Sequence, residues 1–231
     1  MIVIFNGPPA SGKDEAASLY KEQFGFGNLS FKYQLFKETV KHFGVDQRWF
    51  MEGYDNRETK EKKEIALNDM SRREAMIHVS EDIIKPKHGL DYFGQLVAEE
   101  IEVDKHYAVA DGGFVEELEP IIEKVGTENI VIVQLTREGH DYSTDSRRYF
   151  NGNLIKEVAI NHETRVDKAY VLKEEMDIKT YRVHNNGSVR NFQSVLTDIY
   201  NELNEDYKLD SINRQTEEHS ETEHNQSEDV S

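Results

Sequence analysis

The sequence predicts an α/β fold with a parallel five-stranded sheet between two layers of helices. Short apolar runs alternate with segments whose apolar residues recur at helical spacing, which is the order of βαβ units. The first run ends in a Gly/Pro turn, as a buried parallel strand does. The 231 residues suffice for one domain with insertions. We expect strands at Ile2–Phe5, Leu29–Phe31, Tyr107–Ala110, Ile130–Leu135 and Ile178–Val183.

Helices are expected between and after these strands. Lys13–Phe24 has a broad apolar face at helical spacing. Ser71 and Glu74 form the pattern of a capping box, and we expect the helix that they open to end near Ile84, before Pro86. The other predicted helices cover Gln34–Phe43, Tyr92–Val103, Phe114–Val125 and Ser188–Leu203.

Composition excludes several classes of function. The net charge of −17 disfavours stable, non-specific binding to nucleic acid, because such binding needs a basic surface. The chain has no cysteine, which excludes disulfides, thiolate zinc sites and a cysteine nucleophile. No apolar stretch has the length of a signal peptide or a membrane span, so we expect a cytoplasmic protein that does not bind membranes.

The acidic residues are concentrated in part at the C-terminus. From Ser211 to Ser231, six acidic residues and one arginine give a local charge of −5, which leaves −12 for the rest of the chain. This stretch has too few apolar residues to offset the entropy of ordering. We therefore expect one domain over residues 1–205 and an acidic, disordered tail over residues 206–231.

The stretch that follows the first predicted strand has the spacing of a phosphate-binding loop: Gly, four residues, Gly-Lys. Its glycines allow the backbone N–H groups to converge on phosphate oxygens, and the helix that follows directs its positive end to the same place. Asp14 replaces the usual Ser or Thr and is a hard oxygen ligand suited to Mg²⁺. An ordinary strand-to-helix turn is the alternative. The predicted nucleotide contacts are Gly7, Ala10, Ser11, Gly12, Lys13 and Asp14.

Asp111 is the second candidate for a magnesium ligand. It follows the apolar strand Tyr107–Ala110, and ligands bind at the carboxyl ends of parallel strands in open α/β sheets. It could hold the metal through water or act in catalysis. The alternative is that Asp111 caps the helix Phe114–Val125.

Two segments are longer than a single crossover. We interpret residues 32–95 as an acceptor-binding insertion and residues 138–168 as a lid. Taken singly, each arginine in them is better explained as a solvated surface residue or a structural ion pair, but the adjacent pairs in an otherwise acidic chain make a functional role equally plausible. The candidate cations are Lys32, Arg57, Arg72 and Arg73 for substrate binding, Arg137 for nucleotide binding, and Arg147 and Arg148 for catalysis.

Five short motifs follow one another in the chain: Ser11 to Asp14, Lys32 to Leu35, Glu52 to Thr59, Arg72-Arg73, and Asn185 to Ser188. In this order they resemble those of the deoxynucleoside monophosphate kinases of tailed bacteriophages. Only the phosphate loop is specific by itself. The resemblance covers nearly the whole chain except the tail.

The resemblance implies a P-loop kinase fold, a three-layer sandwich with an acceptor-binding insertion and a lid, in the cytoplasm of an infected host. It implies ATP and Mg²⁺ as cofactors and the reaction ATP + dNMP → ADP + dNDP. Lys32 and Arg57 would then lie near the acceptor, and Asn185, Asn186 and Gly187 near the donor adenine. For the last three, a turn followed by the N-cap serine of the last helix is the alternative.

One position departs from the family pattern. Where related cellular kinases carry Asp-Gly-x-Pro-Arg, this chain has Asp111-Gly112-Gly113-Phe114-Val115. Without that arginine, the acceptor phosphate falls to Arg57, Arg72 or Arg73. A homodimer remains open. Three other functions also remain open: a kinase of hydroxymethylated bases in phage DNA, another small-molecule kinase of this fold, such as one for phosphomevalonate or dephospho-coenzyme A, and a nucleotide-binding regulator without turnover.

Overall fold

The computed structural model describes residues 1–143, 145, 147–151, 154–158, 169–171 and 177–207, without the side chains of Arg57 and of residues 151–171. The chain forms two compact units, Met1–Asn186 and Gly187–Ser231. In the second unit, a helix covers residues 189–207. Residues 208–231, which are most of the predicted tail, lie outside the described residues. No helix in the described ranges combines the length and the apolar character needed to cross a membrane.

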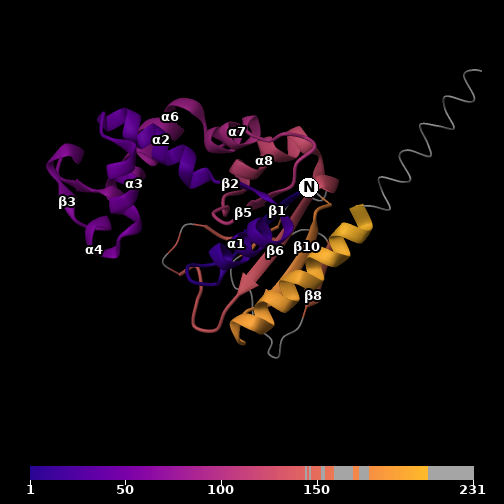
Figure 1. Cartoon of the computed structure of the whole chain (residues 1–231). Coiled ribbons are helices and arrows are strands. Elements are labelled where there is room, and N and C mark those ends of the chain that lie inside the picture. Colours follow the sequence, from indigo (N-terminus) through magenta and orange to yellow (C-terminus); the bar gives the residue numbers. More distant parts are fainter. Residues whose placement is uncertain (144, 146, 152–153, 159–168, 172–176, 208–231) are drawn as a thin grey trace, which may run out of the picture. The chain divides into compact units, whose positions relative to one another are not determined.

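The first unit contains an all-parallel sheet with strand order β2-β5-β1-β6-β10-β8 (Figure 1). The five predicted strands are present as neighbours, although β2 begins and ends two residues before the expected range. The prediction of five strands was incomplete, because β8 pairs with β10 and adds a sixth. The strands are β1 Ile2–Asn6, β2 Gly27–Leu29, β5 Tyr107–Val109, β6 Ile130–Thr136, β8 Leu154–Val158 and β10 Lys179–His184.

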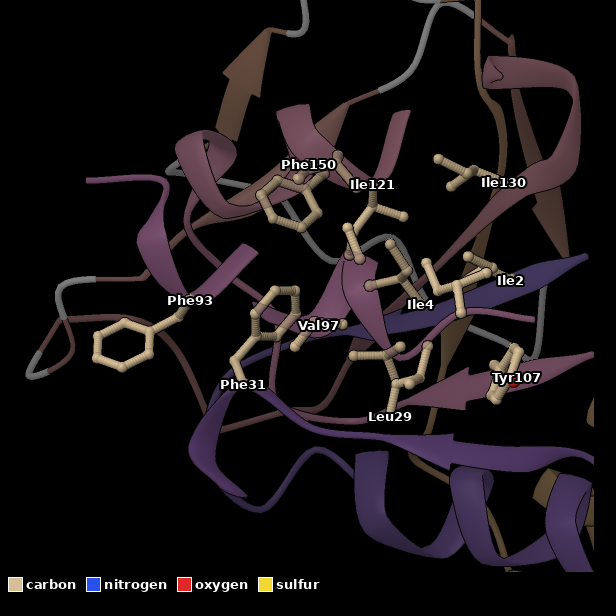
Figure 2. Packing of buried hydrophobic residues seen from close by; sticks show 14 of the residues in the cluster. Ile2, Ile4, Leu29, Phe31, Phe93, Val97, Tyr107, Ile121, Ile130 and Phe150 are labelled. Atoms are coloured by element: carbon tan, nitrogen blue, oxygen red, sulfur yellow. The ribbon is translucent and has the colours of Figure 1, made fainter. Parts of the chain in front are cut away.

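Helices pack on both faces of this sheet because β1 alternates its buried side chains between them. Ile2 and Ile4 belong to a core cluster with residues of α7 and α8, and Figure 2 shows Ile121 and Val97 among these side chains. On the other face, the ring of Phe5 contacts Tyr20 of α1 edge to face, with 5.0 Å between centroids. The helices are α1 Lys13–Phe24, α2 Phe31–Phe43, α7 Tyr92–Glu99, α8 Val115–Val125 and the short 3-10 helix η3 Thr127–Asn129.

The predicted insertion has a small hydrophobic core of its own, which consists of Phe36, Phe50, Leu67, Ala75 and Met76. Leu35 and Phe43 pack against both this cluster and the cluster on the sheet, so the insertion is connected to the main core through α2. Its elements are α3 Gln47–Asp55, α4 Arg57–Lys60, β3 Lys63–Glu64, η1 Ile65–Leu67, β4 Met70–Ser71 and α5 Arg72–His78, with β3 and β4 paired antiparallel.

The helix that starts after Ser71 has the predicted capping box but not the predicted end. Ser71 Oγ accepts a hydrogen bond from the N–H of Glu74, and the Glu74 carboxylate accepts one from the N–H of Ser71. The helix continues through a π-helical turn, η2 Val79–Ile84, into α6 Lys85–His88. Because Pro86 has no N–H and its ring would crowd a regular α-turn, the wider turn accommodates it without ending the helix.

Part of the predicted lid segment belongs to the core. Tyr142, Tyr149 and Phe150 are buried, and Phe150 joins the cluster on the face of the sheet that α7 and α8 cover. Figure 2 shows Phe150 among these side chains. Two short strands of this region, β7 Tyr149–Asn151 and β9 Ala169–Val171, pair in parallel.

Candidate functional site

The loop between β1 and α1 has the backbone that its glycines predict. A Cβ at Gly7 would lie 2.5 Å from the carbonyl oxygen of Leu135 and from Ser11 Oγ, so no side chain fits there. Gly12, at the N-cap of α1, has φ 104°, which favours glycine, and Ala10 has φ 62°. The loop connects the carboxyl end of β1 to the N-terminus of the 12-residue helix α1, where backbone N–H groups can bind an anion.

Lys13 is buried in this loop. Its side chain is 8% exposed, and Nζ donates a hydrogen bond to the carbonyl oxygen of Pro8 at 2.7 Å. Burial, and after it the positive charge of Arg147, lowers the pKa of Lys13 to about 8, although the negative charge of Asp14 acts in the opposite direction. The ammonium group is thus charged at pH 7. Because it is buried, a nearby anion would stabilise its charge strongly.

Ser11 carries an unsatisfied hydroxyl. Its side chain is 0% exposed, and Ser11 Oγ has no hydrogen-bond partner among the described residues. Leaving a buried hydroxyl unpaired costs about 1–3 kcal/mol, so such groups usually mark a place where a ligand or water completes the bonding. The unpaired hydroxyl lies inside the loop that the spacing predicts to bind phosphate.

Residues that follow the neighbouring strands β6 and β10 form hydrogen bonds with the loop between β1 and α1. Arg137, directly after β6, donates from Nη1 to the carbonyl oxygen of Ala10 at 3.1 Å. Asn185, directly after β10, donates from Nδ2 to the carbonyl oxygen of Ser11 at 2.9 Å. Both residues were predicted to contact the nucleotide, and both lie against its predicted loop.

The turn after β10 divides between the two units. Asn186 accepts a hydrogen bond from the N–H of Glu138 at 2.7 Å, which ties it to the start of the predicted lid. Gly187 begins the second unit, where Ser188 Oγ accepts a hydrogen bond from the N–H of Asn191. The N-cap serine that the alternative interpretation predicted is therefore present.

Arg147 is held beside the loop by an aspartate. Its Nη2 lies 2.6 Å from Asp145 Oδ2, and its Nε donates to Asp145 Oδ1 at 3.0 Å. Burial opposes the charge of Arg147, but the hydrogen bonds with Asp145 outweigh it and raise the pKa of Arg147 above its usual range. Its aliphatic stem passes over Gly113, where a Cβ would come within 2.6 Å of it. The neighbouring Arg148 has an exposed side chain.

Asn6, the last residue of β1, forms hydrogen bonds with the backbone of Arg148 and Phe150. Its Oδ1 accepts a hydrogen bond from the N–H of Phe150 at 2.7 Å, and its Nδ2 donates to the carbonyl oxygen of Arg148 at 3.0 Å. The sequence interpretation missed Asn6, although a buried polar residue between an apolar strand and a glycine loop is a usable signal. Asn6 connects the residue before the loop to the backbone beside Arg147.

Asp111 lies at the carboxyl end of β5, as expected, but it caps a different helix from the predicted one. Its carboxylate accepts hydrogen bonds from Ser30 Oγ at 2.5 Å and from the N–H groups of Phe31 at 3.2 Å and Lys32 at 2.9 Å. These groups form the N-terminus of α2. The alternative, a cap on the helix after Phe114, was wrong, because α8 has no side-chain cap.

The two predicted magnesium ligands differ in what surrounds them. Asp14 is exposed in the first turn of α1, next to Lys13, and its carboxylate oxygens suit Mg²⁺. Both oxygens of Asp111 already accept hydrogen bonds from α2. Within the described ranges, no three His, Cys, Asp or Glu side chains cluster as a metal site. The donor set fits an ion that one carboxylate and substrate phosphates hold together.

Two of the predicted substrate-binding cations, Arg72 and Arg73, make their side-chain contacts inside the insertion. Arg72 is 3% exposed and donates from Nη1 to the carbonyl oxygen of Thr59 at 3.2 Å, with its guanidinium 4.2 Å above the ring of Trp49. Arg73 pairs with Glu61 at 3.8 Å on the surface. Lys32 follows the cap of α2, and the side chain of Arg57 lies outside the described part of the structure.

The site thus unites Lys13, Asp14, Arg137, Arg147 and Asn185 around one loop, and it leaves Arg72 and Arg73 in the insertion. Compared with protein-family models, the chain matches none, and it likewise matches no curated protein.

Proposed function

We propose that this protein transfers the γ-phosphoryl group of ATP to a deoxynucleoside monophosphate and releases ADP and the diphosphate. The observation that carries the proposal is the loop itself. A glycine loop at the carboxyl end of a parallel strand contains a buried lysine and a buried hydroxyl that has no hydrogen-bond partner in the described part of the chain. The choice of acceptor rests on the resemblance to phage kinases and on an insertion with its own core.

The chemistry requires no general base, since an oxygen of the acceptor phosphate is already a nucleophile at pH 7. This oxygen forms a bond to the γ-phosphorus, and the bond to the β-phosphate oxygen breaks, with its electron pair leaving on ADP. Catalysis then depends on positioning and on charge stabilisation. Lys13, the loop N–H groups and Arg147 supply positive potential where negative charge develops.

Magnesium belongs to this proposal as the partner of the nucleotide. In this proposal Asp14 would hold the ion together with the phosphates, and its exposed carboxylate beside Lys13 supports this role. When bound, the ion would neutralise charge on the β- and γ-phosphates. Asp111 contributes to this site by holding the N-terminus of α2, since both of its carboxylate oxygens accept hydrogen bonds there.

The proposal is tested with Lys13→Ala and the matched control Lys21→Ala. Lys21 is an exposed lysine of the same helix, so both variants remove one positive charge from α1. With a panel of deoxynucleoside monophosphates, a coupled assay of ADP release should show a fall in kcat of roughly 100-fold or more for Lys13→Ala only. Full activity of Lys13→Ala would contradict the proposal.

The same assay separates the other candidate functions. ADP release only with DNA that contains hydroxymethylated bases would identify a DNA-base kinase. Release with phosphomevalonate or dephospho-coenzyme A would identify another small-molecule kinase. Binding of ATP without release of ADP for any acceptor would identify a nucleotide-binding regulator.

A further inference from the structure

Two lysine side chains of the insertion lie over one aromatic ring. Lys60 Nζ, at the end of α4, is 4.1 Å from the centre of the Tyr54 ring. Lys32 Nζ, in the first turn of α2, is 5.8 Å from the same centre and 5.7 Å from the centre of the Phe36 ring. The two rings touch edge to face, with 4.9 Å between their centroids. The ammonium groups are therefore at most about 10 Å apart, the sum of their distances from the Tyr54 ring.

Among the described residues, no carboxylate lies within 4.0 Å of either ammonium group. In the described residues, ion pairs within 4.0 Å involve five other lysines but neither Lys32 nor Lys60. Lys62, two residues from Lys60, does have a carboxylate, Glu64, at 3.8 Å. In a chain of net charge −17, two lysines that share a ring without a counterion leave a local concentration of positive charge. An anion between them would remove their mutual repulsion.

The backbone around Lys60 is fixed by the buried Arg72. Arg72 Nη1 donates to the carbonyl oxygen of Thr59, and Thr59 Oγ1 donates to the carbonyl oxygen of Gly53 at 2.8 Å. A Cβ at Gly53 would lie 2.2 Å from the Arg72 guanidinium, so the glycine makes room for it. These contacts connect α3 to the residue before Lys60.

The backbone of Lys32 is fixed from the other side. Its N–H donates to Asp111 at 2.9 Å, at the carboxyl end of β5. The charge of Asp111 also acts on Lys13 and on Arg147 in the candidate site. One lysine of the pair is thus anchored at the edge of the nucleotide site and the other inside the insertion.

We propose that Lys32 and Lys60 together bind the phosphate group of the monophosphate acceptor, with the Tyr54 ring holding both side chains in place. This inference rests on the proposed function. It names two residues that would bind the acceptor phosphate in place of the arginine that related kinases carry after the strand corresponding to β5. Arg72 is buried and donates a hydrogen bond to the carbonyl oxygen of Thr59, and Arg73 forms an ion pair with Glu61. A phosphate monoester carries a charge of about −1.5 to −2, which two lysines match as point charges.

The test compares Lys60→Ala with Lys62→Ala, because Lys62 is two residues away, pairs with Glu64, and its replacement changes the net charge equally. Isothermal titration measures the binding of each deoxynucleoside monophosphate and of the corresponding nucleoside, without ATP. Lys60→Ala should weaken monophosphate binding by about tenfold or more and nucleoside binding by less than about twofold, because only the phosphate meets the lysine. Lys62→Ala should change neither.

Two further measurements make the result decisive. Lys60→Gln keeps most of the aliphatic stem over Tyr54 and removes the charge, so it should repeat the loss even if the alanine variant folds poorly. ATP binding should be unchanged in all variants. Equal monophosphate affinity in Lys60→Gln and wild type would overturn this subsite and leave the proposed function standing. Wild-type protein that binds ATP but no monophosphate would overturn the proposed function and the subsite with it.

Discussion

At the level of single residues, Lys13 combines the charge that phosphate binding needs with a burial that disfavours charge. Its pKa of about 8 lies below the ordinary lysine value of 10.5, with burial as the main cause. Below pH 8 the folded and the unfolded protein both carry the proton, and the folded protein bears the full cost of burying it. Between pH 8 and 10.5 only the unfolded protein stays protonated, so this cost disappears as the pH rises.

Lys13→Met should therefore stabilise the nucleotide-free protein at pH 7, by about 1–3 kcal/mol, because it removes a buried charge and keeps the stem. The gain over wild type should shrink as the pH rises above 8. Urea denaturation at pH 7 and pH 10 measures the free energy of unfolding of both proteins. A variant less stable than wild type at pH 7 would contradict the assignment of a destabilising buried charge.

The residues of the loop could be predicted, but their contacts across the chain could not. The loop glycines and Lys13 act through local backbone geometry, which the spacing in the sequence shows directly. The bond from Asn6 to Arg148 spans 142 positions, and the bond from Lys32 to Asp111 spans 79. No pattern within a short window signals such pairs, so Asn6 was missed, and the alternative interpretation of Asp111 as a helix cap named the wrong helix.

Asn6→Ala should destabilise the protein by about 2–4 kcal/mol, because it removes the acceptor for the buried N–H of Phe150 and one hydrogen bond to the carbonyl oxygen of Arg148. It should also lower kcat, since Arg147 lies next to the freed backbone. Asn28→Ala, at an exposed position of β2, is the control and should stay within about 0.5 kcal/mol of wild type. Equal free energies of unfolding for the two variants in thermal denaturation would contradict a stabilising role of the Asn6 hydrogen bonds.

At the level of elements, predictability follows how local each signal is. β1 and β6 each begin with four apolar residues and are buried along their length, and α5 begins with a capping box, so the sequence sufficed for all three. Two of the five residues of β8 are charged, so its sequence does not resemble that of a buried strand. It joins the sheet by pairing with β10. The π-helical turn before Pro86 depends on how the chain accommodates a missing N–H, which hydrophobic spacing does not encode.

The cap that Asp111 places on α2 gives a prediction about an element. Asp111→Ala should cost about 2 kcal/mol, because two N–H groups at the start of α2 and Ser30 Oγ lose their acceptor. Asp91→Ala, at the N-cap position of α7 where no side-chain cap bond exists, should cost much less. Urea denaturation with EDTA present measures both. Equal stability of Asp111→Ala and wild type without metal would show that the cap is unimportant.

At the level of the whole molecule, a strongly acidic chain concentrates its positive charge at few places. The net charge is −17, and −12 without the stretch from Ser211 to Ser231. Against this background, Lys13, Arg137 and Arg147 surround the loop, while Lys32 and Lys60 share a ring in the insertion. Such a distribution suits small phosphorylated ligands better than a long polyanion, whose binding needs an extended basic surface.

The most direct test of the central claim follows the phosphoryl group itself. Wild type and Lys13→Ala are incubated with Mg²⁺, γ-labelled ATP and each deoxynucleoside monophosphate in turn, and the labelled products are separated. The account predicts label in the β-position of at least one deoxynucleoside diphosphate with wild type, and almost none with Lys13→Ala. Label that stays in ATP for every acceptor, or equal transfer by both proteins, would contradict it.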